Sequence, residues 1–372
     1  MRVCIDATPL LLRSAGVKNY LYHWILHLRK LAGDRAILAF PFLNDLGELH
    51  HEQSVRGRWS TFARLVWLRI ANLRGNPMLD LLGRRIDLFH ASSVQVQNPP
   101  RNTRLTATLY DMTCWLVPET HLPANVIASK RFAERVVKRA DGLIAISDNT
   151  RRDAVRILGL APEKIRVIYP GVAEAFFDTA PEAIRQVKEK YALMHPYILF
   201  VGTVEPRKNV DMLLDAYQQL AASLRGAFEL VLAGPIGWAS RSTLERLHAK
   251  PPGVRYLGYV PERDLPALTS GATVFAYLPL YEGFGFPVAQ AMAAGVPVIT
   301  SNLSSLPEIA GDAALLVDPR SVQETRAALE RLLLSPSLRA EVRNNGARRA
   351  GQYRWEGCAR ASLEFFEFVS GI

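Results

Sequence analysis

The chain has 372 residues, and 49% of them are hydrophobic, so two domains can each bury a core. The formal net charge of +10 favours a polyanionic partner, which can be nucleic acid, anionic lipid or a phosphorylated small molecule. No segment approaches the roughly 18 uncharged apolar residues of a membrane span, and the charged start MRVCIDATPLLLR differs from a signal peptide. We therefore expect a soluble, cytoplasmic protein.

Short β-branched runs alternate with helix-period segments along the chain, a pattern typical of parallel sheets with helices on both faces. A loop over 7–16 leads into a helix with one apolar face, made by Tyr20, Leu21, Trp24, Ile25 and Leu28. The strands predicted in the first half are RVCID (2–6), AILAF (36–40), IDLFHAS (86–92), LTATLYD (105–111), GLIAIS (142–147) and IRVIYPG (165–171).

The alternation of apolar strand and helix segments is interrupted after Gly171 and then resumes with a second set of predicted strands. We place an N-terminal Rossmann-like domain at 1–172, a C-terminal one at 173–354, and a final helix at 355–372 that packs back across the domains. The strands predicted in the second half are YILFVGT (197–203), FELVLAG (228–234), VRYLGYV (254–260), ATVFAYL (272–278), VPVITS (296–301) and AALLVD (313–318). Two such doubly wound domains are expected to face each other across a cleft.

Arg207 and Lys208 follow the first strand of the second half, at its carboxyl end. Open α/β sheets bind ligands at this end, where a pyrophosphate needs cations to neutralise it and Arg can supply a bidentate fork. The alternative is a pair of solvated cations. The position at the ligand edge of the sheet favours phosphate binding.

The stretch PLYEGFGFPVAQAMAAG (279–295) predicts a turn followed by a helix that opens near Pro287 and ends near Gly295. The backbone amides of Gly283, Phe284, Gly285 and Phe286 then lie at a helix start that suits an anion or ligand oxygens, while the two phenylalanine rings suit the core or the wall of a cleft. Glu282 precedes that helix and can accept hydrogen bonds from sugar hydroxyls. Its alternative role is to stabilise the helix dipole.

The motif YEGFGFPVAQAMAAGVPVITSNLSSLPEIAGDAALLVDP (281–319) resembles the signature of family 4 retaining glycosyltransferases, which have the GT-B fold of two Rossmann-like domains. The segments 143–172, 197–217 and 254–285 also resemble that family, in its order, so the resemblance covers nearly the whole chain. It implies an enzyme that moves a sugar from a nucleoside diphosphate donor to an acceptor with retention at the anomeric carbon. The donor is a substrate, and no cofactor is implied.

The resemblance assigns roles to single positions. Lys208 and Arg207 would hold the donor diphosphate, and Glu282 with the amides of 283–286 would hold the sugar hydroxyls. Gly16 would let the loop of the first domain approach the phosphates, and Ser147 would line the cleft near the acceptor or donor sugar.

Two positions depart from the family pattern. The second acid of its two-acid motif is Gln290 here, and an amide can still bind ribose with one acceptor and one donor group, although less firmly. A cleft histidine is replaced by Tyr110, which can donate a hydrogen bond but does not copy imidazole's proton chemistry near neutral pH. Neighbouring Asp111 is a candidate sugar or acceptor contact or a turn-forming residue, and His121 lies in a long loop nearby.

No metal site is expected. The chain has no Asp-x-Asp, no His or Cys cluster has metal-ligand spacing, and the separated Cys4, Cys114 and Cys358 suit reduced core thiols. Arg207, Lys208 and the helix amides would then have to stabilise the departing diphosphate.

The segment 56–74 places apolar side chains near one helical face, with arginines distributed around it. An amphipathic helix with arginines and tryptophan is typical of segments that bind an anionic membrane surface. The alternative is an ordinary helix of the domain with solvated arginines. The apolar residues are Trp59, Phe62, Val66, Ile70 and Leu73, and the arginines are Arg56, Arg58, Arg64, Arg69 and Arg74.

The sequence thus predicts a metal-independent retaining glycosyltransferase, with mannose from GDP-mannose as the leading donor and a glycan or polyprenyl-diphosphate-linked sugar as acceptor. With a polyprenyl-diphosphate-linked acceptor, a peripheral site on the inner face of the plasma membrane would explain both the positive charge and the aromatic residues of 56–74. Two alternatives stay open: a catalytically silent sugar-nucleotide or glycan-binding partner subunit, suggested by Tyr110 and Gln290, and a sugar-nucleotide epimerase, for which no acid/base pair is identified. No nucleic-acid motif is present.

Overall fold

A computed structural model describes residues 1–12, 16–49, 54–55, 57–71, 78–237 and 241–371. The chain divides into two compact units. Unit 1 contains 1–171 together with 354–372, and unit 2 contains 172–353. Each unit is described by itself, so the expected cleft between two facing domains stays a prediction.

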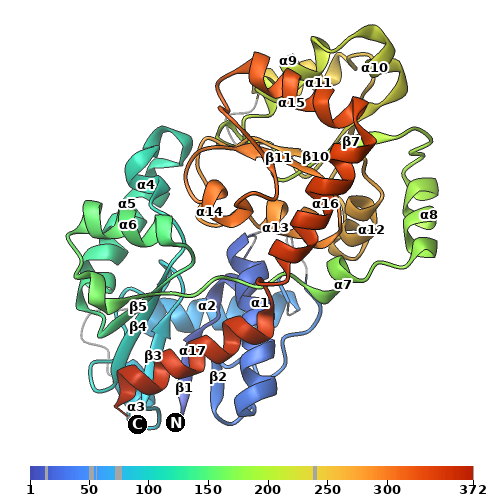
Figure 1. Ribbon diagram of the computed structural model, residues 1–372. Helices are drawn as coiled ribbons and strands as arrows, with labels where there is room; N and C mark the ends of the chain where they lie inside the picture. The colour runs from blue at the N-terminus through green and yellow to red at the C-terminus, as the bar shows by residue number, and fades with distance from the viewer. Residues whose placement is uncertain (13–15, 50–53, 56, 72–77, 238–240, 372) are drawn as a thin grey trace. The chain divides into compact units, whose positions relative to one another are not determined.

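Unit 1 is built on a parallel sheet in the order β2-β1-β3-β4-β5-β6 (Figure 1). Its strands are short and almost wholly buried, as expected when helices cover both faces of a parallel sheet. The strands are β1 (Val3–Asp6), β2 (Ile37–Phe40), β3 (Leu88–Ala91), β4 (Arg104–Leu109), β5 (Gly142–Ala145) and β6 (Ile165–Val167). The α-helices are α1 (Gly16–Ala32), α2 (Arg58–Ala71), α3 (Met78–Gly83), α4 (Thr113–Leu116), α5 (Pro123–Arg135), α6 (Asp148–Leu158) and α17 (Trp355–Ser370).

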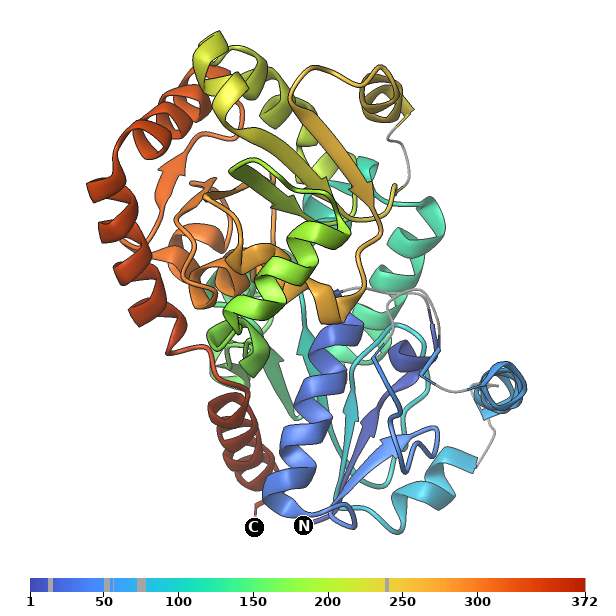
Figure 2. The same cartoon turned by 90° about the vertical axis from the view of Figure 1, so that its right-hand side faces the viewer.

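Helices α1 and α17 lie side by side in unit 1 although they come from opposite ends of the chain (Figures 1 and 2). The predicted apolar face of α1 is fully buried from Tyr20 to Leu28. The indole N–H of Trp24 donates to Ser362 Oγ at 2.9 Å, which satisfies a polar group inside this apolar contact. The last helix is therefore an integral part of unit 1.

Unit 2 has a second parallel sheet in the order β12-β11-β10-β7-β8-β9 (Figure 1). Its strands are β7 (Tyr197–Val201), β8 (Glu229–Ala233), β9 (Val254–Gly258), β10 (Val274–Tyr277), β11 (Val298–Ser301) and β12 (Leu315–Val317). Its α-helices are α7 (Glu174–Phe177), α8 (Pro181–Lys190), α9 (Val210–Gln218), α10 (Ala222–Ala227), α11 (Arg241–His248), α12 (Leu265–Ser270), α13 (Phe286–Ala293), α14 (Leu306–Ala310), α15 (Val322–Leu334) and α16 (Pro336–Ala350).

The strand order of unit 2 marks where a ligand is expected. Counted from β7 as the first strand, the order is 3-2-1-4-5-6, that of a doubly wound dinucleotide-binding sheet. The order reverses between β7 and β10, and the loops that leave these two strands diverge there. The predicted fold class is confirmed, because each half forms the parallel sheet of six strands that its sequence predicts.

Candidate active site

The candidate site of unit 2 lies on the two loops that leave β7 and β10. The first loop contains a 3₁₀ turn, Pro206–Lys208, and the second runs from Leu278 into α13. The backbone N–H of Leu280 donates to the carbonyl of Arg207 at 2.9 Å and so joins the loops. Asn209, with φ of 58°, donates from its amide to the carbonyls of Leu278 and Pro319. Residues 69 and 110 positions apart in the chain are thereby brought together.

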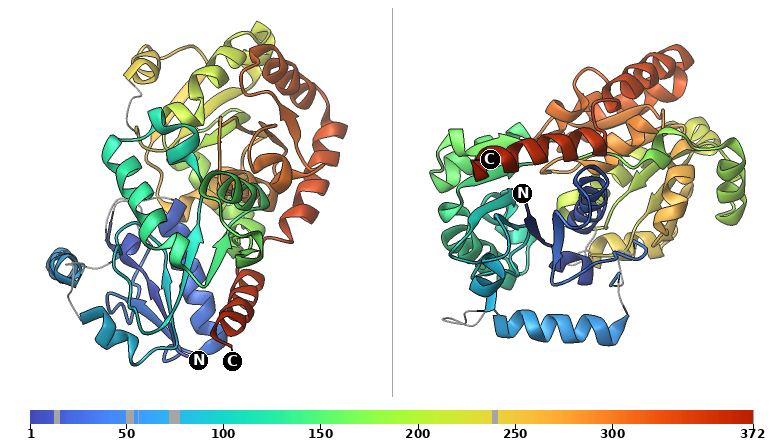
Figure 3. Two further views of the ribbon diagram at one scale, coloured as in Figure 1. Left: turned by 90° about the vertical axis from the view of Figure 1, so that its left-hand side faces the viewer. Right: turned by 90° about the horizontal axis from the view of Figure 1, so that it is seen from below.

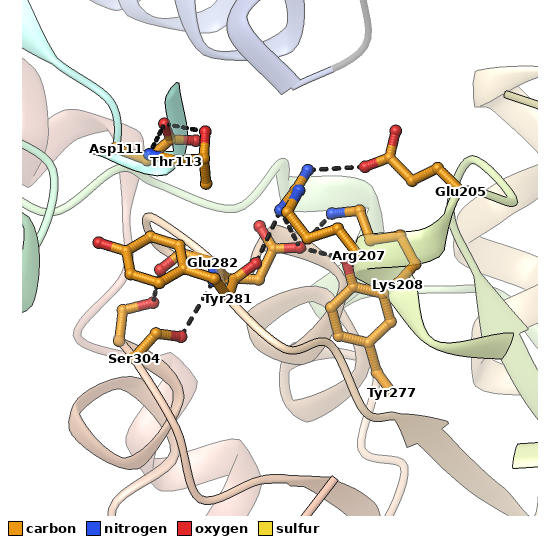
Figure 4. A network of polar contacts seen from close by, with 10 residues as sticks. Asp111, Thr113, Glu205, Arg207, Lys208, Tyr277, Tyr281, Glu282 and Ser304 are labelled. Atoms are coloured by element: carbon orange, nitrogen blue, oxygen red, sulfur yellow. Dashed lines mark hydrogen bonds and ion pairs between the residues drawn. The ribbon is translucent and has the colours of Figure 1, made fainter. Parts of the chain in front are cut away.

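Glu282 is the centre of a buried ionic cluster (Figure 4). Its Oε1 accepts a hydrogen bond from the Tyr277 hydroxyl at 2.6 Å, pairs with the Lys208 ammonium, and lies 3.2 Å from Nη1 of Arg207. The Glu282, Lys208 and Arg207 side chains are only 12–13% exposed. All three contacts use Oε1, so they leave Oε2 to accept hydrogen bonds from a ligand.

Two further contacts hold Arg207 besides the one with Glu282. Its Nη1 donates to the carbonyl of Tyr281 at 2.7 Å, and its Nη2 donates to Oε1 of Glu205 at 2.8 Å. Glu205 is itself nearly buried, with a side chain 5% exposed. Two carboxylates thus balance two cations, and a bound diphosphate would compete with Glu282 for Lys208 and Arg207.

The charge state of the cluster follows from these contacts. Burial by itself would raise the pKa of Glu282, but the charges of Lys208 and Arg207, with hydrogen bonds from Lys208 and Tyr277, lower that pKa to about 2. Burial and the Arg207 charge lower the pKa of Lys208, and Glu282 opposes them. Burial and the Glu282 charge raise the pKa of Tyr277 well above 10, so its hydroxyl stays a donor.

The turn after Glu282 has a backbone that requires glycine. Gly285 has φ of 95°, and a Cβ there would lie 2.4 Å from Cδ2 of Leu306. The Glu282 N–H donates to Ser304 Oγ, and the Ser305 hydroxyl donates to the Glu282 carbonyl, both at 3.0 Å. These contacts fix the direction in which the Glu282 side chain leaves the loop.

The remaining unit 2 candidates lie on or just before α13, which begins at Phe286 as predicted. Gly283 is buried in the turn, and Gln290 is half-buried on the helix. The Phe284 ring is buried and packs edge-on against Phe286 and Tyr353, so these rings contribute to the core of unit 2. What Gln290 and the amides of 283–286 bind stays a prediction.

The unit 1 candidates come from several separate elements of that unit. Tyr110 packs edge-on against Tyr20 with the ring centroids 5.4 Å apart, and its hydroxyl is buried. Burial and the nearby Asp6 charge raise the pKa of Tyr110 well above 10. Gly16 is the exposed first residue of α1, with open space where a Cβ would stand. His121 is half-buried in the loop after Pro118–Thr120.

Two unit 1 candidates have clear local structural roles. Asp111 accepts hydrogen bonds from the N–H and the hydroxyl of Thr113 at 3.0 and 2.6 Å, the turn-forming alternative raised by the sequence (Figure 4). Ser147 is fully buried and caps α6, accepting from the N–H of Thr150 at 3.1 Å. Both contacts are internal to unit 1 and do not test a role in ligand binding.

Sequence reasoning missed Glu205, Tyr277 and Ser304. Tyr277 ends an apolar strand and looks like a core residue, and Glu205 looks like a solvated charge in a turn. The sequence did contain a signal for Glu205. This residue lies two positions before Arg207, in the loop that the sequence predicts to bind the ligand.

No group of three or more His, Cys, Asp or Glu side chains within the described ranges is arranged to hold a metal ion. Cys4, Cys114 and Cys358 are buried free thiols, as predicted.

Comparisons with known proteins bear on the family and the fold. Residues 182–349 match the family model of glycosyl transferases group 1, and residues 14–176 match that of glycosyltransferase family 4. The chain is 33% identical over 274 residues to the O-antigen chain mannosyltransferase B of Escherichia coli, covering 73% of this chain and 72% of the relative. It is 30% identical to the serotype-specific mannosyltransferase WbdA of Escherichia coli over 62% of this chain, but only 29% of that relative.

Solved structures support the fold. Anabaena HepE in complex with UDP superposes with a TM-score of 0.74 at 18% identity, and sucrose-phosphate synthase from Thermosynechococcus elongatus with 0.76 at 19%, each covering 100% of both chains. At such identities the likeness concerns the fold alone, and that fold is GT-B. With two family models that together span both units, the chain belongs to the family 4 glycosyltransferases.

Proposed function

We propose that the protein is a metal-independent retaining glycosyltransferase that transfers mannose from GDP-mannose to a glycan or polyprenyl-diphosphate-linked acceptor at the cytoplasmic face of a membrane. The observation that carries the proposal is the buried Glu282, Lys208 and Arg207 cluster on the two diverging loops of unit 2. Mannose is proposed because mannosyltransferases are among the relatives at 30% identity or more.

In this proposal the cluster changes partners when the donor binds. The donor diphosphate takes hydrogen bonds from Lys208 and Arg207, and Glu282 turns its carboxylate to hydroxyls of the sugar. Glu205 stays bonded to Arg207 and keeps the guanidinium in place. As the glycosidic phosphate bond breaks, the two cations stabilise the negative charge that develops on the leaving diphosphate.

Thermal unfolding in the presence of UDP, GDP, dTDP or ADP tests the donor site. A nucleotide at about 100 times its dissociation constant adds roughly 2.7 kcal/mol of stability. We expect GDP to stabilise the wild-type protein and not Lys208→Ala. Lys190→Ala is the matched control, because Lys190 is a half-exposed lysine of the same unit that pairs with a carboxylate outside the cluster, that of Asp264. Stabilisation by UDP alone would refute GDP-mannose, and stabilisation that survives Lys208→Ala would refute the site.

Transfer needs its own assay. Incubation with GDP-mannose and a glycan acceptor in EDTA should form product at the rate seen without EDTA, and the anomeric proton in the NMR spectrum should show retention. Loss of activity in EDTA would contradict metal independence, and an inverted product would contradict the stereochemistry.

The alternative of a silent binding subunit is favoured by Gln290, which replaces an acid of the family motif. The variant Gln290→Glu distinguishes an active enzyme from a silent subunit. In an active enzyme the new carboxylate should strengthen a hydrogen bond to the ribose by about 1 kcal/mol, which is about fivefold in donor affinity. A variant that gains transfer activity from a level indistinguishable from zero would favour the silent subunit.

A further inference from the structure

Helix α2 is held to unit 1 by one of its faces. The Trp67 ring lies 5.3 Å from that of Phe40 and 5.2 Å from that of Phe42, and Leu68 is buried in the core cluster. Arg64 turns inward on the same face and donates to the carbonyl of Pro41. The contacts that fix α2 therefore use only part of its circumference.

The opposite face of α2 is apolar and exposed. Trp59 is 87% exposed and Phe62 is 63% exposed, and Val66 and Ile70 are exposed by 42% and 45%. The spacings of three, four and four residues place these four side chains, here named the α2 stripe, on one side of the helix. Figures 2 and 3 show α2 at the outer edge of unit 1. A surface helix ordinarily turns polar residues outward, and a contiguous exposed apolar patch marks an interaction site.

A neighbouring residue extends the patch and is held in a strained backbone. Phe42, whose ring contacts Trp67, is 53% exposed and has φ of 60°. This left-handed conformation is unfavourable for a bulky side chain, and such conformations cluster at functional sites.

The charge of α2 selects the kind of partner. Its sequence, RWSTFARLVWLRIA, contains three arginines and no acidic residue, and Arg69 is exposed on the stripe side. A symmetric dimer through α2 would place the same cationic surface of two copies against each other with no carboxylate on either helix. Anionic lipid headgroups complement these cations, and tryptophan favours the boundary between headgroups and acyl chains.

We propose that the α2 stripe docks the protein on an anionic lipid bilayer, with the helix lying in the plane of the interface and Arg69 among the headgroups. Within the described ranges, no helix has the length and apolar character of a membrane span. The proposal goes beyond donor chemistry, because none of the cluster residues in unit 2 takes part. Arg56, Leu73 and Arg74, which the sequence also assigned to this surface, lie outside the described residues.

Vesicle co-sedimentation of the full chain tests the proposal. The protein should bind vesicles of equal parts phosphatidylcholine and phosphatidylglycerol and bind phosphatidylcholine alone at least about fivefold more weakly, since an arginine near such a surface contributes about 1 kcal/mol. The double variant Trp59→Ser/Phe62→Ser should lower the partition coefficient about tenfold or more, because two aromatic side chains no longer leave water. Arg69→Gln should lower it about fivefold.

The control is Leu334→Ser/Phe368→Ser, which removes two other large apolar side chains that are 68% and 74% exposed. It should bind as the wild type does. A second measurement does not depend on weakened binding. Brominated lipid should quench the tryptophan emission of the wild type. The variant Trp59→Phe should still bind vesicles but lose most of this quenching.

Three results would overturn the proposal: unchanged vesicle binding in Trp59→Ser/Phe62→Ser, an equal loss in the control, or a dimer that this double variant converts to monomer without any vesicle binding. Donor stabilisation by nucleotide is measured in the same variants and should be unchanged. A failure of membrane docking is thus distinguishable from a failure of the proposed transfer activity.

Discussion

Glu282→Gln is the substitution for which the structure makes the most quantitative prediction. The amide keeps the shape of the side chain but removes the charge that Lys208 and Arg207 share. The pKa of Glu282 is about 2 against an ordinary value of 4.5, and at roughly 1.4 kcal/mol for each pKa unit this corresponds to about 3 kcal/mol. Removing one partner of a buried ion pair independently costs about 3–5 kcal/mol. We therefore expect a loss of about 3 kcal/mol at pH 7.

The pH dependence has a definite sign. Because the folded-state pKa is depressed, the contribution of Glu282 is complete above about pH 4.5, where the unfolded-state group is ionised, and is lost as the pH falls through about 2. Urea unfolding of the wild type and Glu282→Gln between pH 7 and pH 2 should therefore show two stability curves that converge in acid.

The control is Glu245→Gln, which removes the charge of an exposed pair with Arg241 and should change stability by less than about 0.5 kcal/mol. The double variant Lys208→Met/Glu282→Gln should lose less stability than the sum of the losses in the two single variants, since the two residues share one contact. A loss below about 1 kcal/mol at pH 7, with curves that stay parallel in acid, would refute the ionised, paired state of Glu282.

Three further substitutions test other parts of the structure. Tyr277→Phe deletes a buried hydroxyl bonded to a carboxylate and should cost about 1.5–3 kcal/mol in urea unfolding while it lowers kcat; an unchanged kcat would show that this hydroxyl does not orient Glu282. Gly285→Ala introduces a Cβ against Leu306 at a position with positive φ, and it should lower stability by about 1–3 kcal/mol in thermal unfolding. Its control is Gly357→Ala, where the new Cβ on α17 meets open space, and this variant should gain about 0.5–1 kcal/mol in the same scans. Ser147→Ala should cost about 1–2 kcal/mol by removing the α6 cap without changing nucleotide stabilisation, and weaker nucleotide binding would instead support a direct role in the site.

Much of the fold was predictable because buried parallel strands have a recognisable local sequence pattern. Each of the twelve predicted strands is a short apolar run bounded by turn residues, and buried parallel strands require that pattern. The positions of Arg207, Lys208 and Glu282 after β7 and β10 were predictable for the same reason, since the end of a strand is visible in sequence. Membership of family 4 followed from motifs that the comparisons confirm.

The α2 stripe shows a limit of periodicity. The sequence indicates one apolar face with arginines around it, but Trp67 and Leu68 are also apolar and lie on the other side. Only the packing of unit 1 decides which of the two faces is covered, and it leaves Trp59 and Phe62 in water.

The sequence by itself determined the two parallel sheets, the loops that carry charge, and the family, because each depends on residues that are close neighbours in the chain. Tertiary structure alone decided that Glu205 and Tyr277 complete the Glu282 cluster and that Ser147 is a buried cap. These roles depend on which side chains meet across loops far apart in the chain, and on how much water they retain when they meet. Neither quantity is encoded in a local pattern, so the charge state and the exposed surfaces of this protein follow from its packing.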